Sequence, residues 1–148
     1  MPHADHQPLD LAQIAEQALT LLRDDRVCFL ATTDGDQPRL RPMSPVKTDG
    51  FTVYFVNLLS HNKTREIANN PKVELCYLDE HHCQVRITGV AEVVSDSAIL
   101  QEVLGEKTLL RGYLETIDRS QFLLYRVHPM LVRYMQEGTA DYYTVPLE

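Results

Sequence analysis

Two short basic segments carry the residues whose types and spacing could bind an anion. Residues 38–44 contain Arg39 and Arg41, and a strand there would place both guanidinium groups on one face. Residues 60–67 place Lys63 and Arg65 at the start of an expected helix. Cations are unfavourable at a helix N-terminus, so a phosphate bound there is one way to stabilise this arrangement.

Both segments also have a purely structural interpretation. Lys63 and Arg65 would then be solvated and compensated by Glu66, because cation penalties at exposed helix ends are only ~0.3–1 kcal/mol. The two arginines of residues 38–44 would be the charged face of an edge strand that carries Pro42. From the residues alone, both interpretations stay open.

A further polar strand face is expected at residues 84–88. Gln84, Arg86 and Thr88 would share one face, with Val85 and Ile87 on the other. A side-chain amide both donates and accepts hydrogen bonds, which suits the mixed edge of a heterocycle. Without other support, the same pattern indicates only an amphipathic strand.

The histidines and cysteines give no metal or nucleophile motif. His81, His82 and Cys83 are adjacent in an expected turn, where neighbouring residues rarely converge on one ion without a further ligand pair. Cys28 and Cys76 lie in apolar runs, as small buried thiols do. We therefore expect no metal site, and the odd cysteine count is typical of a reducing compartment.

The elements that must position these residues begin with a helix over residues 9–24, which carries an apolar stripe at helical spacing. Asp-Gly turns at residues 34–35 and 49–50 and a change to strand-like patterns follow. A region over residues 105–120 is expected to be partly helical. The predicted strands are 27–33, 38–43, 51–56, 73–78, 85–94, 122–127 and 131–136, and the predicted short helices are 62–69 and 96–104. This order predicts an α+β fold around a barrel or curled sheet.

Composition limits the classes of function. A chain of 148 residues with 44% hydrophobic and 24% charged residues is expected to form one domain over residues 1–148, with a core over about 10–136 and a short tail. The net charge of −7 argues against nucleic-acid or membrane-surface binding. No apolar run approaches membrane-spanning length and no signal peptide is evident, so we expect a cytoplasmic protein.

Taken in order, several segments resemble the pyridoxamine 5'-phosphate oxidase-like family, especially its general stress protein branch. The matching segments are RVCFLAT from residue 26, PRLRPM from 38, VYFVN from 53, KTREIANNP from 63, QVRITGVAE from 84, FLLYRV from 122 and VRYM from 132. No single segment is specific, but their order and spacing are. The resemblance covers residues from about 10 to 136.

The resemblance implies a split β-barrel of about six strands that forms a homodimer and binds FMN across the subunit interface. Arg41 would contact the FMN phosphate, and Lys63 with Asn62 would form the phosphate-binding pair before the helix. Gln84 would reach the flavin edge from the partner strand. The residues implied to line the flavin are Pro42, Met43, Ser44, Phe55 and Val56. The chain departs from the oxidase in having Asn62 in place of an arginine and one extra residue after Asn57.

The resemblance favours an FMN-dependent oxidoreductase or flavin reductase that passes electrons between a reduced nicotinamide and an acceptor. The alternatives are a non-enzymatic FMN-binding stress-response protein, and a split barrel that binds the deazaflavin F420 or haem. The oxidase itself uses a C-terminal extension with tryptophan and arginine, and this sequence has no tryptophan. We therefore do not expect pyridoxamine phosphate oxidation.

Overall fold

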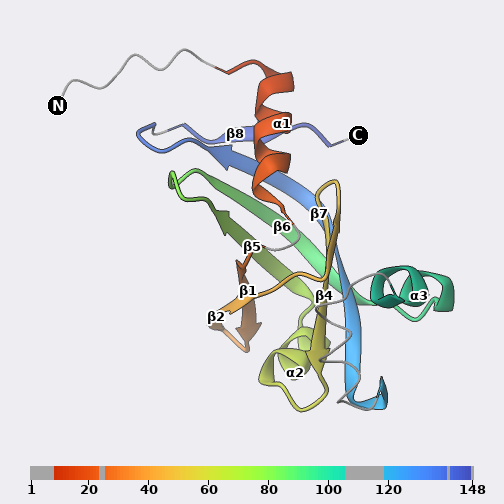
Figure 1. Cartoon of the computed structure of the whole chain (residues 1–148). Helices are drawn as coiled ribbons and strands as arrows, with labels where there is room; N and C mark the ends of the chain where they lie inside the picture. The colour runs from red at the N-terminus through yellow and green to blue at the C-terminus, as the bar shows by residue number, and fades with distance from the viewer. Residues whose placement is uncertain (1–8, 24–25, 106–118, 140, 148) are drawn as a thin grey trace.

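A computed structural model describes residues 9–23, 26–105, 119–139 and 141–147. In these residues an eight-stranded antiparallel sheet curls around a core, with α1 at one end, α2 at the other and α3 beside it (Figure 1). The helices are α1 (Leu11–Leu21), α2 (Asn62–Asn69) and α3 (Ser97–Gly105), with a 3₁₀ helix η1 (Arg119–Gln121). The strands are β1 (Cys28–Asp34), β2 (Gln37–Met43), β3 (Lys47–Asp49), β4 (Thr52–Leu58), β5 (Lys72–Leu78), β6 (Gln84–Val93), β7 (Phe122–Met135) and β8 (Tyr143–Val145). The predicted α+β class is confirmed.

The sheet follows the order β2-β1-β5-β6-β7-β4-β3, and β8 pairs with the far end of β7. All seven pairings are antiparallel. The long strand β7 pairs with β6 along most of its length, with β4 at its first half and with β8 at its second. Consequently β7 joins the two halves of the sheet.

Helix α1 starts where the sequence supplies a reciprocal cap. The Asp10 carboxylate accepts the backbone N–H of Gln13 at 2.8 Å, and the Gln13 side chain accepts the N–H of Asp10 at 3.3 Å. This capping box satisfies two amides that the helix leaves unpaired. The apolar stripe of the helix then buries Ile14, Ala18 and Leu21 against the sheet.

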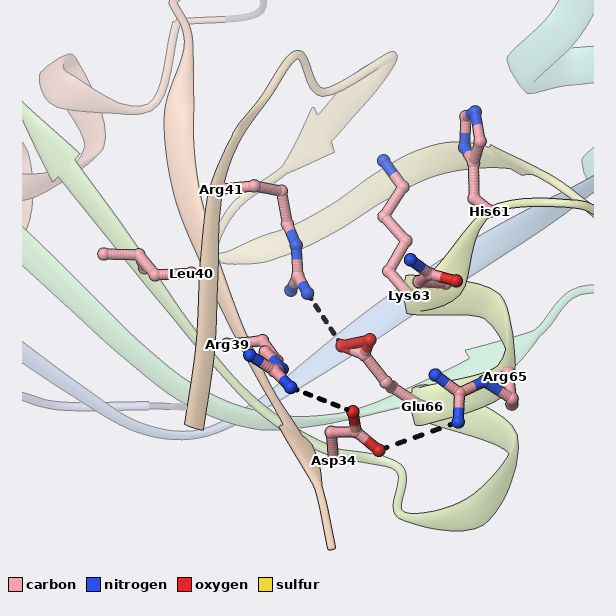
Figure 2. A pocket seen from close by; sticks show the side chains of 9 residues that line it. Asp34, Arg39, Leu40, Arg41, His61, Lys63, Arg65 and Glu66 are labelled. Atoms are coloured by element: carbon pink, nitrogen blue, oxygen red, sulfur yellow. Dashed lines mark hydrogen bonds and ion pairs between the residues drawn. The ribbon is translucent and has the colours of Figure 1, made fainter. Parts of the chain in front are cut away.

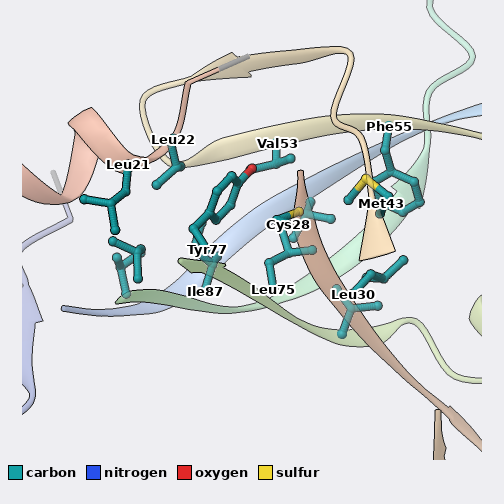
Figure 3. Packing of buried hydrophobic residues seen from close by; sticks show 14 of the residues in the cluster. Leu21, Leu22, Cys28, Leu30, Met43, Val53, Phe55, Leu75, Tyr77 and Ile87 are labelled. Carbon is teal, nitrogen blue, oxygen red and sulfur yellow. The ribbon is translucent and has the colours of Figure 1, made fainter. Parts of the chain in front are cut away.

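The main core fills the inside of the curled sheet, and α1 contributes residues such as Leu21 at one end of it (Figure 3). Leu30, Leu75 and Ile87 come from three neighbouring strands and are fully buried. Tyr77 is also fully buried and lies beside the helix residues Leu21 and Leu22. Burying each large apolar side chain stabilises the fold by roughly 1.5–3 kcal/mol, so this cluster dominates the stability.

A bulge interrupts the pairing of β6 with β7. Gly89 pairs with Pro129 and Thr88 with Leu131, so Met130 is the extra residue of β7. A Cβ on Gly89 would lie 2.4 Å from the carbonyl oxygen of His128, so this position needs glycine. The bulge allows Val127 and Val132, five residues apart, to be buried in the same core.

Four details differ from the sequence-based predictions. Helix α1 spans Leu11–Leu21 and is shorter than the predicted helix over residues 9–24. The two strands predicted on either side of His128 and Pro129 form the single strand β7, because the bulge accommodates Pro129 without ending the ladder. The three-residue strands β3 and β8 were not predicted, and they exist by pairing with β4 and β7. Most of the partly helical region predicted at 105–120 lies outside the described residues.

The predicted short helices are both present. Helix α2 has the predicted bounds, and α3 begins one residue later than predicted because Asp96 caps it by accepting the N–H of Ala98 at 2.8 Å. In the described part of the chain, no helix is long and apolar enough to cross a membrane.

Candidate functional site

A cavity of about 640 Å³ lies between the hairpin β1–β2 and the start of α2 (Figure 2). This volume is in the range of small-molecule sites, roughly 300–1,000 Å³. Its lining residues are mostly charged: Asp34, Arg39, Leu40, Arg41, His61, Asn62, Lys63, Arg65 and Glu66. The structure thus brings together the two basic segments that the sequence singled out.

Strand alternation places the arginines of β2. Arg41 pairs in register with Leu30 and Arg39 with Thr32, so both arginine side chains lie on the inward face of the hairpin. Leu40 points to the opposite side of the strand in Figure 2. The prediction that Arg39 and Arg41 share one face is confirmed.

Arg41 is held by a network that the sequence did not predict. Its Nη1 donates to the carbonyl of Leu30 at 3.2 Å and to Oγ1 of Thr32 at 2.7 Å. Its Nη2 donates to Oε1 of Glu66 at 2.7 Å, and the Thr32 hydroxyl donates to the same oxygen at 2.7 Å. Glu66 is only 3% exposed, so this is a buried carboxylate with two donors on one oxygen. The network fixes the guanidinium beside the cavity.

Lys63 is a second cation of the cavity, and its contacts differ from those of Arg41. It is half-buried at the second position of α2, and none of the described acidic residues lies within ion-pair distance of it. Partial burial lowers the pKa of the Lys63 ammonium, and the nearby Arg41 guanidinium lowers it further. Lys63 therefore carries a charge that a bound anion would stabilise.

The first turn of α2 adds to the positive potential. It contains no acidic residue, and the N-cap residue His61 makes no side-chain hydrogen bond to it. Partial burial and the Lys63 charge both lower the pKa of His61, which favours the neutral imidazole. The partial positive charge of the helix end is thus left uncompensated at the cavity, as in many phosphate sites.

A second carboxylate lies across the cavity. Asp34 is 3.3 Å from Nη2 of Arg39 and 3.6 Å from Nη1 of Arg65, so it bridges a β2 arginine and an α2 arginine (Figure 2). These cations are about half exposed, and such ion pairs contribute little to stability. Their main effect is to set the charge and shape of the cavity wall.

The structural alternative, in which Glu66 compensates Lys63 and Arg65, does not describe the observed contacts. Glu66 pairs with Arg41, and Arg65 pairs with Asp34. One signal in the sequence indicated this network: Thr32 follows Cys28 and Leu30 in the inward-facing positions of β1. A hydroxyl in that series needs a buried partner.

Several residues implied to line the flavin lie away from this cavity in a single chain. The side chains of Met43 and Phe55 are buried in the main core, where the Phe55 ring stacks on Tyr125 at 5.1 Å between centroids. Only their backbone could contact a ligand. Pro42 and Ser44 are exposed, and the half-buried Val56 packs against a second, smaller cluster beside α3.

Gln84 also lies outside the cavity. It is the first residue of β6, pairs with Leu78 and Met135, and is half-buried on the outer face of the sheet. The structure therefore does not bring Gln84 to the cavity of its own chain.

The turn at His81, His82 and Cys83 has a structural explanation. The Asp79 carboxylate accepts the backbone N–H groups of His81 at 2.9 Å and Cys83 at 2.8 Å, and His82 adopts a positive φ of 63°. Within the described ranges, no group of three or more potential ligands could hold a metal ion. The three cysteines are free thiols.

Comparison with known proteins agrees with this fold. The family model of pyridoxamine 5'-phosphate oxidase matches residues 14–136. A pyridoxine/pyridoxamine 5'-phosphate oxidase from Pelagibacter ubique (strain HTCC1062) is 35% identical over 112 residues, which are 72% of this chain and 50% of that protein. The chain thus spans about half the length of this curated relative.

Solved structures share the fold at lower identity. A Clostridium acetobutylicum protein related to general stress protein 26, of the pyridoxinephosphate oxidase family, has a TM-score of 0.77 at 15% identity and covers 93% of this chain and 97% of its own. A haem-binding protein from Mycobacterium smegmatis has a TM-score of 0.74 at 20% identity, and the match covers 94% of this chain and 59% of that protein. An FAD-binding protein from Mesorhizobium loti has a TM-score of 0.64 at 18% identity, and the match covers 80% of this chain and 91% of that protein. The predicted split-barrel fold is confirmed.

Proposed function

Because this chain belongs to the pyridoxamine 5'-phosphate oxidase family, we propose that it binds FMN and is an FMN-dependent oxidoreductase or flavin reductase in the cytoplasm. The flavin would supply the electron chemistry between a reduced nicotinamide and an acceptor. The observation that carries the proposal is the half-buried Lys63, which has no acidic partner among the described residues and lies beside Arg41 at the start of α2. A terminal phosphate is the ligand group that this arrangement suits.

The residues at the cavity fit a phosphate. Lys63 has three N–H donors, and the first turn of α2 adds partial positive charge without an acidic residue to cancel it. Arg41 is held in place by Thr32 and Glu66, so it loses little further side-chain entropy when a ligand binds. Asn62 lies at the same helix end and adds an amide to the cavity lining.

The outer face of the sheet supports a homodimer with FMN at the subunit interface. The cross-strand row Phe29, Cys76, Arg86 and Arg133 runs over this face. Phe29 is 40% exposed, whereas Nε of Arg86 and Nε of Arg133 are buried without a hydrogen-bond partner in the described structure. A covering chain would bury the exposed apolar surface and supply acceptors to these donors.

The neighbouring row of the same face extends this surface. It runs Leu40, Ala31, Glu74, Thr88 and Leu131, and its two ends are exposed leucines at 69% and 37%. A two-fold pairing of this face would also bring Gln84 of one subunit toward its partner, where the family resemblance expects it beside the flavin. The proposed flavin-lining backbone of Pro42, Met43 and Ser44 lies at the end of the hairpin that borders this face.

Two features favour FMN over the other cofactors considered. Nε2 of His128 lies 2.7 Å from Oε1 of Glu92, so this imidazole already has a partner and is a poor axial ligand for haem. Asp34 and Glu66 place two carboxylates in the cavity, which disfavours the long polyanionic tail of F420.

The visible absorption spectrum of the purified protein tests the cofactor. Expected is a flavin spectrum, either as isolated or after adding FMN, with free FMN released on denaturation. A Soret band, or a colourless protein that takes up no FMN, contradicts the proposal. A second measurement separates enzyme from carrier: anaerobic NADH or NADPH should bleach the bound flavin. A flavoprotein that neither nucleotide bleaches would instead support the non-enzymatic FMN-binding stress-response protein.

A further inference from the structure

The buried carboxylate of Glu66 is an unusual component for an anion-binding cavity. It is 3% exposed, lines the cavity, and lies 2.7 Å from the guanidinium of Arg41. A carboxylate at this place repels any anion that approaches Arg41. Its presence therefore calls for an explanation beyond anion binding itself.

One part of the explanation is the position of Arg41. Three hydrogen bonds hold the Arg41 guanidinium, to Leu30, Thr32 and Glu66, and the Thr32 hydroxyl is itself held by Glu66. Both donors to Glu66 converge on the single oxygen Oε1. Such a network restricts the arginine to one rotamer on the side of the cavity that faces Lys63.

The other part is charge. The cavity is lined by four cationic side chains, Arg39, Arg41, Lys63 and Arg65, against the two carboxylates Asp34 and Glu66, so its formal charge is +2. A phosphate monoester carries about −1.5 to −2 at pH 7, because its second pKa is about 6. The two carboxylates thus lower the formal charge of the cavity from +4, which would suit a polyanion, to +2, which matches a single terminal phosphate.

We propose that Glu66 is the specificity-determining residue of the cavity: it anchors Arg41 and cancels its charge, which selects ligands that end in one phosphate monoester over longer polyanions. This inference rests on the proposed FMN function, since it concerns the same cavity. Glu66 touches no ligand in this role and acts through Arg41. Asp34, which bridges Arg39 and Arg65, makes the same contribution at the outer wall.

The variant Glu66→Gln separates charge from hydrogen bonding. A glutamine Oε1 in the same place accepts from both Arg41 and Thr32, so the network is kept while the negative charge is removed. FMN and riboflavin differ only in the phosphate, and their affinities for the apoprotein are measured by flavin fluorescence titration. Removing the charge should raise FMN affinity about tenfold and leave riboflavin affinity unchanged. Inorganic pyrophosphate should also become a better competitor relative to inorganic phosphate.

The matched control is Glu102→Gln on α3, which removes the same charge at an exposed residue outside the cavity. It should change neither flavin affinity. If Glu66→Gln leaves the FMN-to-riboflavin affinity ratio unchanged or lowers it, the inference is overturned. Wild-type protein that binds neither flavin would instead overturn the proposed FMN function, so the two failures are distinguishable.

A second variant keeps the inference testable if Glu66→Gln does not fold. Asp34 is a third exposed and its carboxylate pairs only with side chains in the described structure, so Asp34→Asn should fold. It should raise the FMN-to-riboflavin ratio about threefold, because its charge is more screened by solvent. An unchanged ratio in this variant, with Glu66→Gln unfolded, also overturns the inference.

Discussion

The two ends of the β1–β2 hairpin use one strand pattern for two purposes. At one end, Cys28 pairs with Met43 and both side chains are buried in the apolar core. At the other end, the same inward-facing positions hold Thr32 and Arg39, and between the ends Leu30 pairs with Arg41. The transition from core to cavity thus takes place within two residue pairs.

The difference shows how a binding site is built next to a core. The apolar end stabilises the fold by removing hydrocarbon from water and has no orientation requirement beyond packing. At the polar end, the buried carboxylate of Glu66 is stable because it accepts hydrogen bonds from Arg41 and Thr32. Changes at the first end should therefore alter stability, whereas changes at the second should alter ligand binding.

The largest expected effect tests the apolar end. Leu30→Ala should lower the free energy of unfolding by roughly 4 kcal/mol, because Leu30 is fully buried and its removal leaves a cavity. Urea denaturation measures this loss. Leu11→Ala, the same change at a residue that is 63% exposed, is the control and should cost less than about 0.5 kcal/mol. Equal losses in the two variants would contradict the assignment of Leu30 to the core.

The junction of the two ends is tested by Glu66→Ala. Removing the side chain takes away the acceptor that Arg41 and Thr32 share and leaves both donors without this partner, and we expect a loss of about 3 kcal/mol. Thermal unfolding should show a much smaller loss for Glu66→Gln, which keeps both hydrogen bonds. If the two variants lose the same stability, the charge rather than the hydrogen-bond network is what holds this corner together.

Lys63→Gln tests the polar end alone. Loss of a charged hydrogen bond to phosphate should weaken FMN binding about thirtyfold, or ~2 kcal/mol. Stability should stay the same or rise slightly, because burial lowers the pKa of Lys63 and so disfavours its charged form. The control is Lys72→Gln, at an exposed residue of β5. If Lys63→Gln lowers the free energy of unfolding and leaves FMN affinity unchanged, Lys63 stabilises the fold and does not bind the phosphate, contrary to this expectation.

The pH dependence of FMN affinity is a second test of Lys63 as a ligand-binding residue. Since its pKa is lowered, the ammonium loses its proton at a lower pH than an ordinary lysine does. FMN affinity should therefore fall as pH rises through this lowered pKa, and Lys63→Gln should abolish that fall. Fluorescence titrations at increasing alkaline pH measure the effect. A fall that persists in the variant would assign the titration to another group.

The smallest expected effect belongs to the buried thiol of Cys28. Burial raises its pKa from 9.0 to about 11, with a hydrogen bond from Tyr77 opposing the shift. Between these values the unfolded chain loses the thiol proton while the folded chain keeps it, so stability falls as pH rises. At pH 10 the loss is about 1 kcal/mol. Urea denaturation at pH 8 and 10 should show this pH-dependent loss in the wild type and a smaller loss in Cys28→Ala, where the raised pKa of Cys76 still contributes.

Local patterns were enough to predict the elements that frame the site. The bounds of α2 follow from the polar run before Asn70 and Pro71, and the hairpin follows from the Asp-Gly turn, where Gly35 has a φ of 64°. The shared face of Arg39 and Arg41 follows from strand alternation. These features depend on neighbours within a few residues.

The partners within the site could not be predicted in this way. Glu66 lies 25 positions from Arg41 and 34 from Thr32, so their contact depends on how α2 docks against β1. Likewise, β8 is a strand only because β7 lies beside it. Sequence periodicity carries no information on such long-range pairs. The sequence therefore indicated Lys63 and Arg65 as cations that could bind an anion, and it offered Glu66 only as the carboxylate that compensates them.

The bulge at Met130 has a consequence for how the chain tolerates changes in length. The buried residues Val127 and Val132 are five positions apart, an odd number, and they share a core only because Met130 shifts the alternation by one. Deleting Met130 would leave these two valines four positions apart, an even number, so a regular ladder without the bulge would still place both in the core. A single deletion should therefore be accepted at the bulge, whereas a single deletion in the regular part of β7 should exchange the inward and outward side chains beyond it.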